Sequence, residues 1–350
     1  MPDVTTTATR MELLDYQIAR ALIALEGPSE LLTRMGDYSL GLVGTQGEET
    51  EPDVRAQVQG KRLRPQIAML VAEAVGGSAE QAAPGAAAIE LLHNFTLIHD
   101  DIQDRSPNRR HRPTVWRVWG DGQAINAGDA LFAVSQLALL NSAQYVSAET
   151  LLLLAQRFNR CTIDIVRGQV QDINNEGRAD VTPGDYLEMI GGKTAAILEF
   201  SAWAGATVGG ADDATARRLG ELGLAIGLGF QIRDDMLGIW SPASETGKDA
   251  ADDIRRKKQS LPILILRANA SAEDTERINH IYAQEEIDEQ EVEEMLGLLA
   301  KYGVEAQTLE HVEVEHRRAM AILDDVFGDT DASAVYELRT LITQLVNRSF

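Results

Sequence analysis

The sequence predicts an all-α protein folded as a single helical bundle. Segments of ten or more residues rich in Ala, Leu, Glu and Arg repeat their apolar positions with the period of an α-helix. Strictly alternating apolar and polar runs, which would indicate β-strands, are few. No composition shift marks a linker, so we expect one domain over residues 11–350, preceded by a flexible tail over residues 1–10.

The expected helices follow one another between loops rich in turn-forming residues. They cover residues 11–25, 64–75, 82–104, 123–142, 147–175, 183–209, 213–239, 260–268 and several stretches after 272. Gly, Pro, Asn, Asp and Ser gather in the breaks at residues 41–53, 104–113, 174–185 and 240–253. Two of these loops directly follow acidic helix ends, which makes those ends candidates for chemistry.

The charge and composition argue against several classes of function. A formal net charge of -22 opposes binding to nucleic acid or anionic lipid, because the long-range field repels both. Cys161 is the only cysteine, so no intrachain disulfide can form. The sequence has neither a signal-peptide core nor a run of about 18 apolar residues that could span a membrane. We therefore expect a cytoplasmic protein with no nucleic-acid partner and no integral membrane segment.

The first acidic motif, HDDIQD, places three carboxylates on one helix face. Asp100 and Asp104 are four residues apart, which is about 40° around a helix, and Asp101 lies within the same arc. Like charges on adjacent turns repel, so this pattern favours a hard cation between them, and Mg²⁺ prefers oxygen ligands. Taken alone, such a motif is more often a solvated acidic helix end.

The second acidic motif, GFQIRDDMLG, sets Asp234 and Asp235 among apolar residues and glycines. Carboxylates in such a context need a cation or hydrogen-bond donors. Gln231 precedes the pair by three and four residues, so all three side chains can share one helix face.

Basic clusters accompany these acids, several of them near turns that a phosphate could approach. They comprise Lys61, Arg62, Arg64, the run Arg109 to Arg112, Lys193, Lys248, Lys257 and Lys258. Acids of the magnesium-binding type beside bases of the phosphate-binding type indicate a polyphosphate substrate, because metal and basic side chains neutralise its oxygens from different sides.

The order of the motifs resembles that of the trans-type polyprenyl synthetase family. GKRLRP, HDDIQD followed by RR, KTAAI, FQIRDDML, and a GK loop leading into KKQSLP occur in this order between Lys61 and Pro262. The resemblance implies an isoprenoid synthase helical bundle around a central substrate cavity. It also implies a trans-prenyltransferase that condenses isopentenyl diphosphate with an allylic diphosphate, uses three Mg²⁺ per active site and forms a homodimer.

The resemblance assigns roles to the residues that match its motifs. Isopentenyl diphosphate is expected at Lys61, Arg64, His93 and Arg110. The allylic diphosphate is expected at Arg109, Lys193, Thr194, Gln231, Lys248 and Lys258. The expected metal ligands are Asp100, Asp101, Asp104, Asp234 and Asp235, and the expected catalytic residues are Asp100, Asp104, Lys193 and Asp234. Gln169 and Asp172 match a further motif and are expected behind the metals and Lys193.

The expected reaction starts with ionisation of the allylic substrate. Its diphosphate group, neutralised by metal held at Asp100, Asp104 and Asp234, departs and an allylic cation remains. The isopentenyl double bond attacks this cation, and the released diphosphate takes the final proton, since no catalytic His or Glu is evident. Gly191 and Gly192 weaken the helix before Lys193, so we expect a kink whose carbonyl oxygens stabilise the cation.

An aromatic residue upstream of the first acidic motif, Phe95, predicts the length of the product. Phe95 lies five residues before Asp100, about 7.5 Å further along the same helix. It resembles the aromatic stop of geranylgeranyl diphosphate synthases, and Thr96 and Leu92 offer less bulk beside it. We therefore expect geranylgeranyl diphosphate as the product. The alternative for Phe95 is an ordinary core residue.

The sequence departs from the family pattern at three positions. Gly238 replaces the third aspartate of the second motif, His111 replaces the glycine that follows RR, and Gln59 replaces a glycine before Gly60.

The alternative functions are a farnesyl or longer-chain diphosphate synthase, a class I terpene cyclase and a non-catalytic regulatory subunit. The intact first motif opposes the regulatory subunit, and KRLRP with a second DD pair opposes the cyclase.

Overall fold

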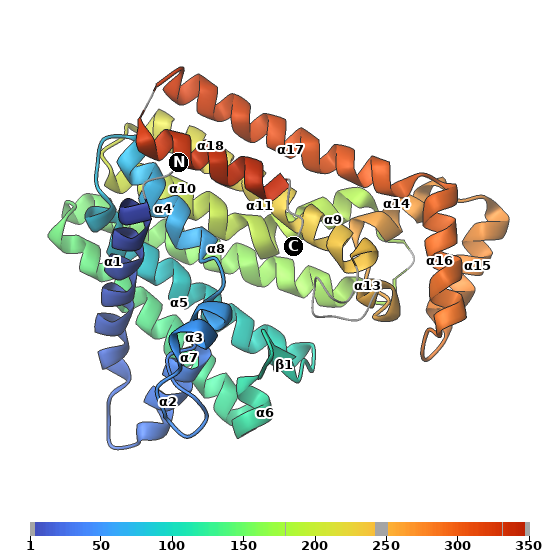
Figure 1. The fold of residues 1–350 in the computed structure, drawn as a ribbon, viewed down its shortest axis with the longest axis horizontal. Helices are drawn as coiled ribbons and strands as arrows, with labels where there is room; N and C mark the ends of the chain where they lie inside the picture. The colour runs from blue at the N-terminus through green and yellow to red at the C-terminus, as the bar shows by residue number, and fades with distance from the viewer. Residues whose placement is uncertain (1–3, 179, 242–250, 331, 347–350) are drawn as a thin grey trace. The chain divides into compact units, whose positions relative to one another are not determined.

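The computed structural model consists almost only of helices (Figure 1). It describes residues 4–178, 180–241, 251–330 and 332–346. Within these residues the only strands are β1 (Asn108–Arg109) and β2 (Arg112–Pro113), which pair antiparallel. None of the described helices combines the length and apolar content needed to cross a membrane. The all-α prediction is confirmed.

The chain forms two compact units that alternate along the sequence. The first comprises residues 1–159, 200–217 and 331–337, and the second comprises residues 160–199, 218–330 and 338–350. Neither unit is one continuous segment, which agrees with the absence of a linker in the sequence. The first acidic motif belongs to the first unit, and the second acidic motif belongs to the second.

The first unit is built around one long helix, α5 (Ala79–Gln103), which packs against α1, α4 and α7 (Figure 1). From Ala82 to Leu92, α5 is rich in alanine and buried on all sides, since small side chains let neighbouring helices approach closely. Ser78 and Gln81 form a capping box that fixes where α5 begins. The other elements of this region are α1 (Val4–Leu22), η1 (Ile23–Leu25), α2 (Glu30–Ser39), α3 (Pro52–Gln59), α4 (Leu63–Ala74), α6 (Val115–Trp119), α7 (Asp121–Leu140) and η2 (Asn141–Gln144).

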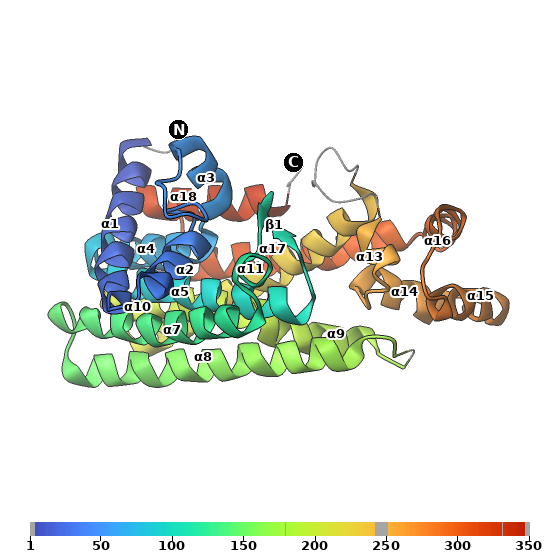
Figure 2. The same cartoon turned by 90° about the horizontal axis from the view of Figure 1, so that it is seen from below.

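The second unit has its own apolar core, formed by residues such as Ile232, Met236, Ile254, Leu264 and Val312. Its elements include α9 (Pro183–Ile190), the π-helical turn η3 (Gly191–Ala195), α13 (Asp252–Arg255), α14 (Leu261–Asn269), α15 (Ala272–Ala283), α16 (Glu289–Lys301) and α17 (Val304–Phe327). Figure 2 shows α15 and α16 side by side at one end of this unit. Helices α8 (Ala148–Asn175), α10 (Ala196–Val208), α11 (Asp213–Trp240) and α18 (Ser333–Val346) contribute residues to both units.

The structure departs from the predicted elements in two ways. Helix α1 begins at Val4, within the tail predicted over residues 1–10. Arg10 is buried and bonded to Glu73 and Glu337, a pairing of distant residues that helical periodicity cannot reveal. The short helices α2, α3 and α6 were not predicted, since segments of 5 to 10 residues give little periodicity.

Candidate active site

The first acidic motif ends helix α5. Asp100 and Asp101 lie in the last turns, and Asp104 is the C-cap residue, whose N–H donates to the Asp100 carbonyl at 2.8 Å. Asp101 is buried, whereas Asp104 is exposed. The C-terminal end of a helix carries partial negative charge, so three carboxylates there call for a neighbouring cation.

The cation next to the first acidic motif is Arg109, which lies on strand β1 of the β1–β2 hairpin. Its Nε donates to Asp101 Oδ1 at 2.8 Å, and its Nη2 donates to Asp100 Oδ2 at 3.2 Å. Burial raises the pKa of Asp101, and the bond from Arg109 opposes that rise. The two turn residues, Arg110 and His111, both have positive φ (49° and 62°), as a two-residue hairpin loop requires. This explains why a glycine would suit position 111.

A second basic group lies around the middle of α5. Burial lowers the pKa of the Arg64 guanidinium to about 10, despite the opposing charge of Glu90. Burial, together with the charges of Arg64 and Arg110, holds the pKa of His93 well below its usual range, so its imidazole is neutral. The carboxylate of Glu90 is buried near these arginines and accepts a bond from Asn94 Nδ2 at 3.2 Å. Concentrated positive charge of this kind suits a polyanionic ligand.

The segment before α4 lies against this basic group. Gly60 has φ 62°, and a Cβ on it would lie 3.2 Å from the Arg110 guanidinium carbon. Arg110 donates to the carbonyl of Val58, and Lys61, the next residue after Gly60, is exposed. Between this segment, α5 and the hairpin is a cavity of about 60 Å³, whose wall includes Arg109 and Arg110.

The second acidic motif lies within α11, where its two carboxylates have different surroundings. Asp234 is exposed, whereas Asp235 is buried. Both oxygens of Asp235 accept bonds from neutral donors: the Tyr186 hydroxyl at 2.5 Å and Gln231 Nε2 at 3.0 Å. Burial, and then the charge of Asp253, raise the pKa of Asp235 to about 7. Of the two predicted metal ligands, Asp234 is therefore the more open.

The hydrogen bonds continue from Asp235 to the π-helical turn. Thr194 Oγ1 and Gln231 Oε1 are 2.9 Å apart, and the adjacent Lys193 Nζ lies 2.5 Å from Asp172 Oδ2. The break predicted at Gly191 and Gly192 is confirmed, since η3 interrupts the helix there. A π-turn of this kind is often found at functional sites.

Close backbone contact fixes the π-turn against α8. A Cβ on Gly168 would lie 2.2 Å from the backbone nitrogen of Lys193, and one on Gly192 would lie 2.7 Å from the Asp164 carbonyl. No larger residue fits either position without moving the backbone. Glycines on both elements therefore set where Lys193 and Thr194 are held.

The remaining predicted lysines differ in what the structure describes. Lys258 Nζ lies 3.3 Å from Asp253 Oδ1, so this lysine belongs to an ion pair within the second unit. Lys248 lies outside the described residues. Gln169 lies on α8, three residues before Asp172 and half-buried.

Sequence reasoning missed three residues that shape these clusters: Tyr186, Glu90 and Asp253. A lone glutamate inside the apolar run AAAIELLH was a usable signal, because a buried charge needs partners. Tyr186 and Asp253 gave no comparable signal, since Tyr186 bonds to Asp235, 49 positions away, and Asp253 packs against Gly238, 15 positions away.

The predicted chain-length residue Phe95 belongs to an aromatic contact. Its ring centroid is 4.9 Å from that of His99 and 5.4 Å from that of Phe132 on α7. Leu92 is fully buried, and Thr96 donates to the His93 carbonyl at 2.7 Å. Phe95 is thus the largest side chain among the three predicted positions.

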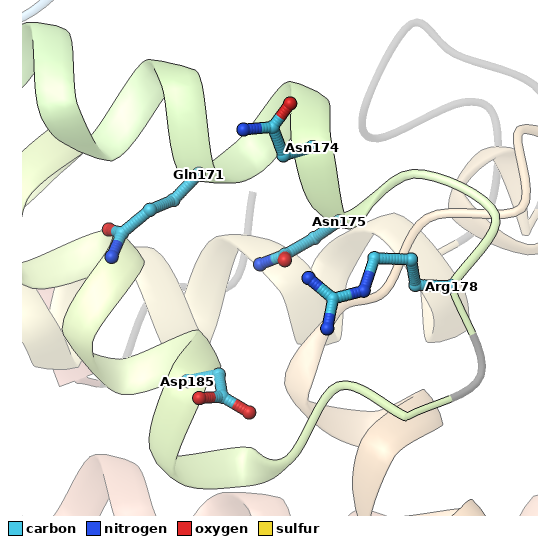
Figure 3. Close-up of a pocket in the computed structure, with 5 residues that line it drawn as sticks. All are labelled: Gln171, Asn174, Asn175, Arg178 and Asp185. Carbon is cyan, nitrogen blue, oxygen red and sulfur yellow. The ribbon is translucent and has the colours of Figure 1, made fainter.

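A separate polar pocket of about 200 Å³ lies where α8 ends and α9 begins. Figure 3 shows its lining side chains, including Asn175, Arg178 and Asp185, around a common space. Arg178 is paired with Asp180, and Asp185 caps α9 through Thr182. Because Arg178 and Asp185 already have partners outside the pocket lining and no lining residue is a predicted site residue, the pocket is not our candidate site.

Comparisons with known proteins give a consistent result. The family model for polyprenyl synthetase matches residues 53–299. The geranylgeranyl diphosphate synthase of Mycobacterium tuberculosis is 35% identical over 90% of this chain and 88% of that protein. The (2E,6E)-farnesyl diphosphate synthase of the same species is 42% identical, but the match spans only 58% of this chain and 56% of that protein. The crystal structure of a polyprenyl synthetase from Streptomyces coelicolor A3(2) has a TM-score of 0.85, with 34% identity and 99% of both chains covered.

Proposed function

The chain belongs to the polyprenyl synthetase family, and we propose that it condenses isopentenyl diphosphate with an allylic diphosphate to make geranylgeranyl diphosphate. One observation carries the proposal most directly. On α5, the carboxylates of Asp100 and Asp101, bonded to Arg109, follow His93 by about two helical turns, and His93 lies among basic residues. Acids suited to a metal therefore lie on the same helix as His93, whose basic neighbours Arg64 and Arg110 suit a diphosphate.

In the first unit, the proposed roles follow from charge and exposure. Lys61, Arg64 and Arg110 bind the diphosphate of isopentenyl diphosphate, and neutral His93 donates a hydrogen bond to it without adding charge. Arg109 is bonded to Asp100 and Asp101, and its guanidinium would be available to the allylic diphosphate if these carboxylates held a metal. Positioning both substrates in this way supplies much of the catalysis.

The donor set fits Mg²⁺. Asp100 and Asp104 offer carboxylate oxygens at a helix end, and Asp234 offers another on α11. Among residues 4–178, 180–241, 251–330 and 332–346, no three acidic, His or Cys side chains converge to hold a metal by themselves. Mg²⁺ in general retains waters and takes substrate phosphate oxygens as further ligands beside one or two carboxylates. Bound there, Mg²⁺ neutralises the departing diphosphate. The three ions per site, and ligation by Asp101 and Asp235, remain part of the proposal.

In the second unit, the proposed role is to hold the allylic diphosphate. Lys193 and Thr194 come from the π-turn, Gln231 bonds to Thr194, and Lys258 is paired with Asp253. Lys248 is assigned to the same diphosphate on the sequence alone. The allylic C–O bond breaks, the isopentenyl double bond attacks the cation, and the released diphosphate removes the proton that regenerates a double bond.

The direct test is the reaction itself. Purified protein is incubated with Mg²⁺, labelled isopentenyl diphosphate and each of the dimethylallyl, geranyl and farnesyl diphosphates, and the products are separated by chromatography. We expect labelled geranylgeranyl diphosphate. Consumption of one allylic diphosphate without incorporation of label would indicate a cyclase. Binding without turnover would indicate a regulatory subunit.

Phe95 is proposed to set the product length, because a bulky ring five residues before Asp100 would block a chain growing along α5. Phe95→Ala should lengthen the product by one or more isoprene units and leave the first condensation nearly intact. Thr96→Ala, which removes little bulk, is the matched control. An unchanged product from Phe95→Ala would move the block to another residue.

We also propose a homodimer, supported by an apolar stripe on α8. Ile163, Val166, Val170 and Ile173 are spaced by three and four residues along one face, and each is 40–50% exposed. Exposed apolar rows of this kind mark protein interfaces. Val166→Glu should shift the mass measured by light scattering to that of a monomer, whereas Val314→Glu, at an exposed valine on α17, should not. A monomeric wild-type protein would contradict the proposal. The cytoplasmic location likewise remains a prediction.

A further inference from the structure

Gly238 and Asp253 share one space in the second unit. Gly238 lies on α11, four residues after Asp234, at the position where the family pattern has an aspartate. A Cβ added to Gly238 would lie 2.5 Å from Asp253 Oδ2 and 2.7 Å from Asp253 Cγ. Contacts this short do not occur between side chains, so the Asp253 carboxylate occupies the space where any side chain at position 238 would begin.

Asp253 is held firmly in that place. It lies on the single-turn helix α13, is only 3% exposed, and precedes Ile254, which is fully buried in the core of the second unit. Left-handed residues stand on both sides of α13, with φ 56° at Ala251 and φ 55° at Lys257. They fold the chain into a tight loop in which the Lys258 N–H donates to the Asp253 carbonyl at 3.0 Å.

The same loop brings the Lys258 ammonium onto the carboxylate. Lys258 Nζ lies 3.3 Å from Asp253 Oδ1, and the lysine side chain is 48% exposed while that of Asp253 is 4% exposed. The pair therefore has a buried, fixed acid and a base that reaches towards solvent. An ammonium group has three N–H donors, so Lys258 can bond to Asp253 and still donate to an anion.

We propose that Asp253 is a positioning residue that fills the space left by Gly238 and holds Lys258 ready for the diphosphate of the allylic substrate. This inference rests on the proposed function, in which Lys258 binds that diphosphate. Lysine has a long flexible stem, and an ion pair formed before binding reduces the freedom lost when the substrate arrives. Gly238 is required because only glycine leaves room for the carboxylate.

Three single variants and one double variant test the proposal. Asp253→Asn removes the charge but keeps the shape, Gly238→Ala adds a Cβ that displaces the carboxylate, and Lys258→Ala removes the ammonium. The measurements are KM for each substrate, kcat, and the rise in melting temperature that inorganic pyrophosphate with Mg²⁺ produces. Glu289→Gln is the matched control, since Glu289 is an exposed acid paired with Arg255 of the same α13.

We expect Asp253→Asn and Gly238→Ala each to raise KM for the allylic diphosphate about tenfold, the usual effect of losing a bond to a charged group. KM for isopentenyl diphosphate should stay unchanged, and the rise in melting temperature with pyrophosphate should shrink. The double variant Asp253→Asn with Lys258→Ala should be no worse than Lys258→Ala alone, because both changes act on one interaction.

The possible failures are distinguishable. If pyrophosphate with Mg²⁺ does not protect the wild-type protein, the proposed function itself is wrong. If it protects the wild type and Lys258→Ala weakens that protection, but Asp253→Asn and Gly238→Ala behave as wild type, Asp253 does not position Lys258. Additive effects in the double variant would overturn the inference equally. Gly238→Ala leaves every charge in place, so it still tests the inference if the Asp253→Asn protein is unstable.

Discussion

The two acidic clusters neutralise their carboxylates in different ways. In the first unit, Asp100 and Asp101 bond to the guanidinium of Arg109, which is 34% exposed at a helix end. In the second unit, Asp235 lies in the interior of α11 and bonds to two neutral donors, Tyr186 and Gln231. An arginine near solvent can be exchanged for a metal ion, whereas buried neutral donors cannot leave without cost.

This difference predicts that the surroundings of Asp235 contribute more to stability than those of the first cluster. Removing Asp104, which is exposed, or Asp100, which is partly exposed, should affect turnover far more than folding, because both lie at the end of α5. Removing a partner from the second cluster should affect folding, because it leaves a buried polar group unsatisfied. The clusters can therefore be distinguished by which quantity each substitution changes.

The largest effect should come from the first cluster. Asp100→Ala or Asp104→Ala should lower kcat by about three orders of magnitude, since the charge of the departing diphosphate is no longer neutralised. The melting temperature should change little. Asp121→Ala, which removes an exposed acid paired with Arg105, should leave kcat unaltered. Near-normal turnover in either motif variant would refute the metal assignment.

The next effect tests the framework role of the second cluster. Tyr186→Phe removes the donor to Asp235 Oδ2 and should lower the free energy of unfolding by about 1–3 kcal/mol. Urea denaturation measures it, with Tyr16→Phe at an exposed tyrosine as the control. An unchanged unfolding free energy would mean that Asp235 does not depend on Tyr186.

A smaller effect separates the two substrates. Arg110→Ala or His93→Ala should raise KM for isopentenyl diphosphate about tenfold and leave KM for the allylic diphosphate nearly constant. Steady-state kinetics with one substrate varied at a time gives both constants. Equal increases in the two constants would contradict the division between the basic group of α5 and the lysines of the second unit.

The smallest effect concerns pH. The pKa of His93 is held below its usual 6.5, first by burial and then by nearby arginines, so the unfolded chain takes up its proton at higher pH than the folded one. The contribution of His93 to stability is therefore complete above pH 6.5 and declines as pH falls towards the folded pKa, by at most about 1.4 kcal/mol per pH unit. Between pH 7.5 and 5.5, wild type should lose more stability than His93→Gln. His280→Gln, at an exposed histidine, should lose as much as wild type, and equal losses in all three would contradict the shift.

The sequence was sufficient to predict the fold class and the long helices, because α8 gives several turns of apolar periodicity and α5 and α11 are long segments rich in Ala and Leu. The break before Lys193 was also predictable, since paired glycines weaken any helix. Short helices such as α6 were not, because five residues contain little more than one turn.

For the candidate site, the sequence indicated which residues carry charge but not which partners they have. The pairing of Tyr186 with Asp235 joins positions 49 apart, and no local pattern predicts it. Gly238 was recognisable as a departure from the family pattern, but the carboxylate of Asp253 beside it was not. Partners of buried charges depend on which helices pack together, which only the folded chain determines.

The pairing of Arg10 with Glu337 has a consequence for synthesis on the ribosome. These residues are 327 positions apart, whereas the second partner of Arg10, Glu73, follows after 63. At translation rates of about 5–20 residues per second, roughly 16 to 65 s pass between the synthesis of Arg10 and the synthesis of Glu337. During that interval α1 can meet Glu73 but not Glu337, so the nascent first unit stays incomplete until the start of α18 has emerged.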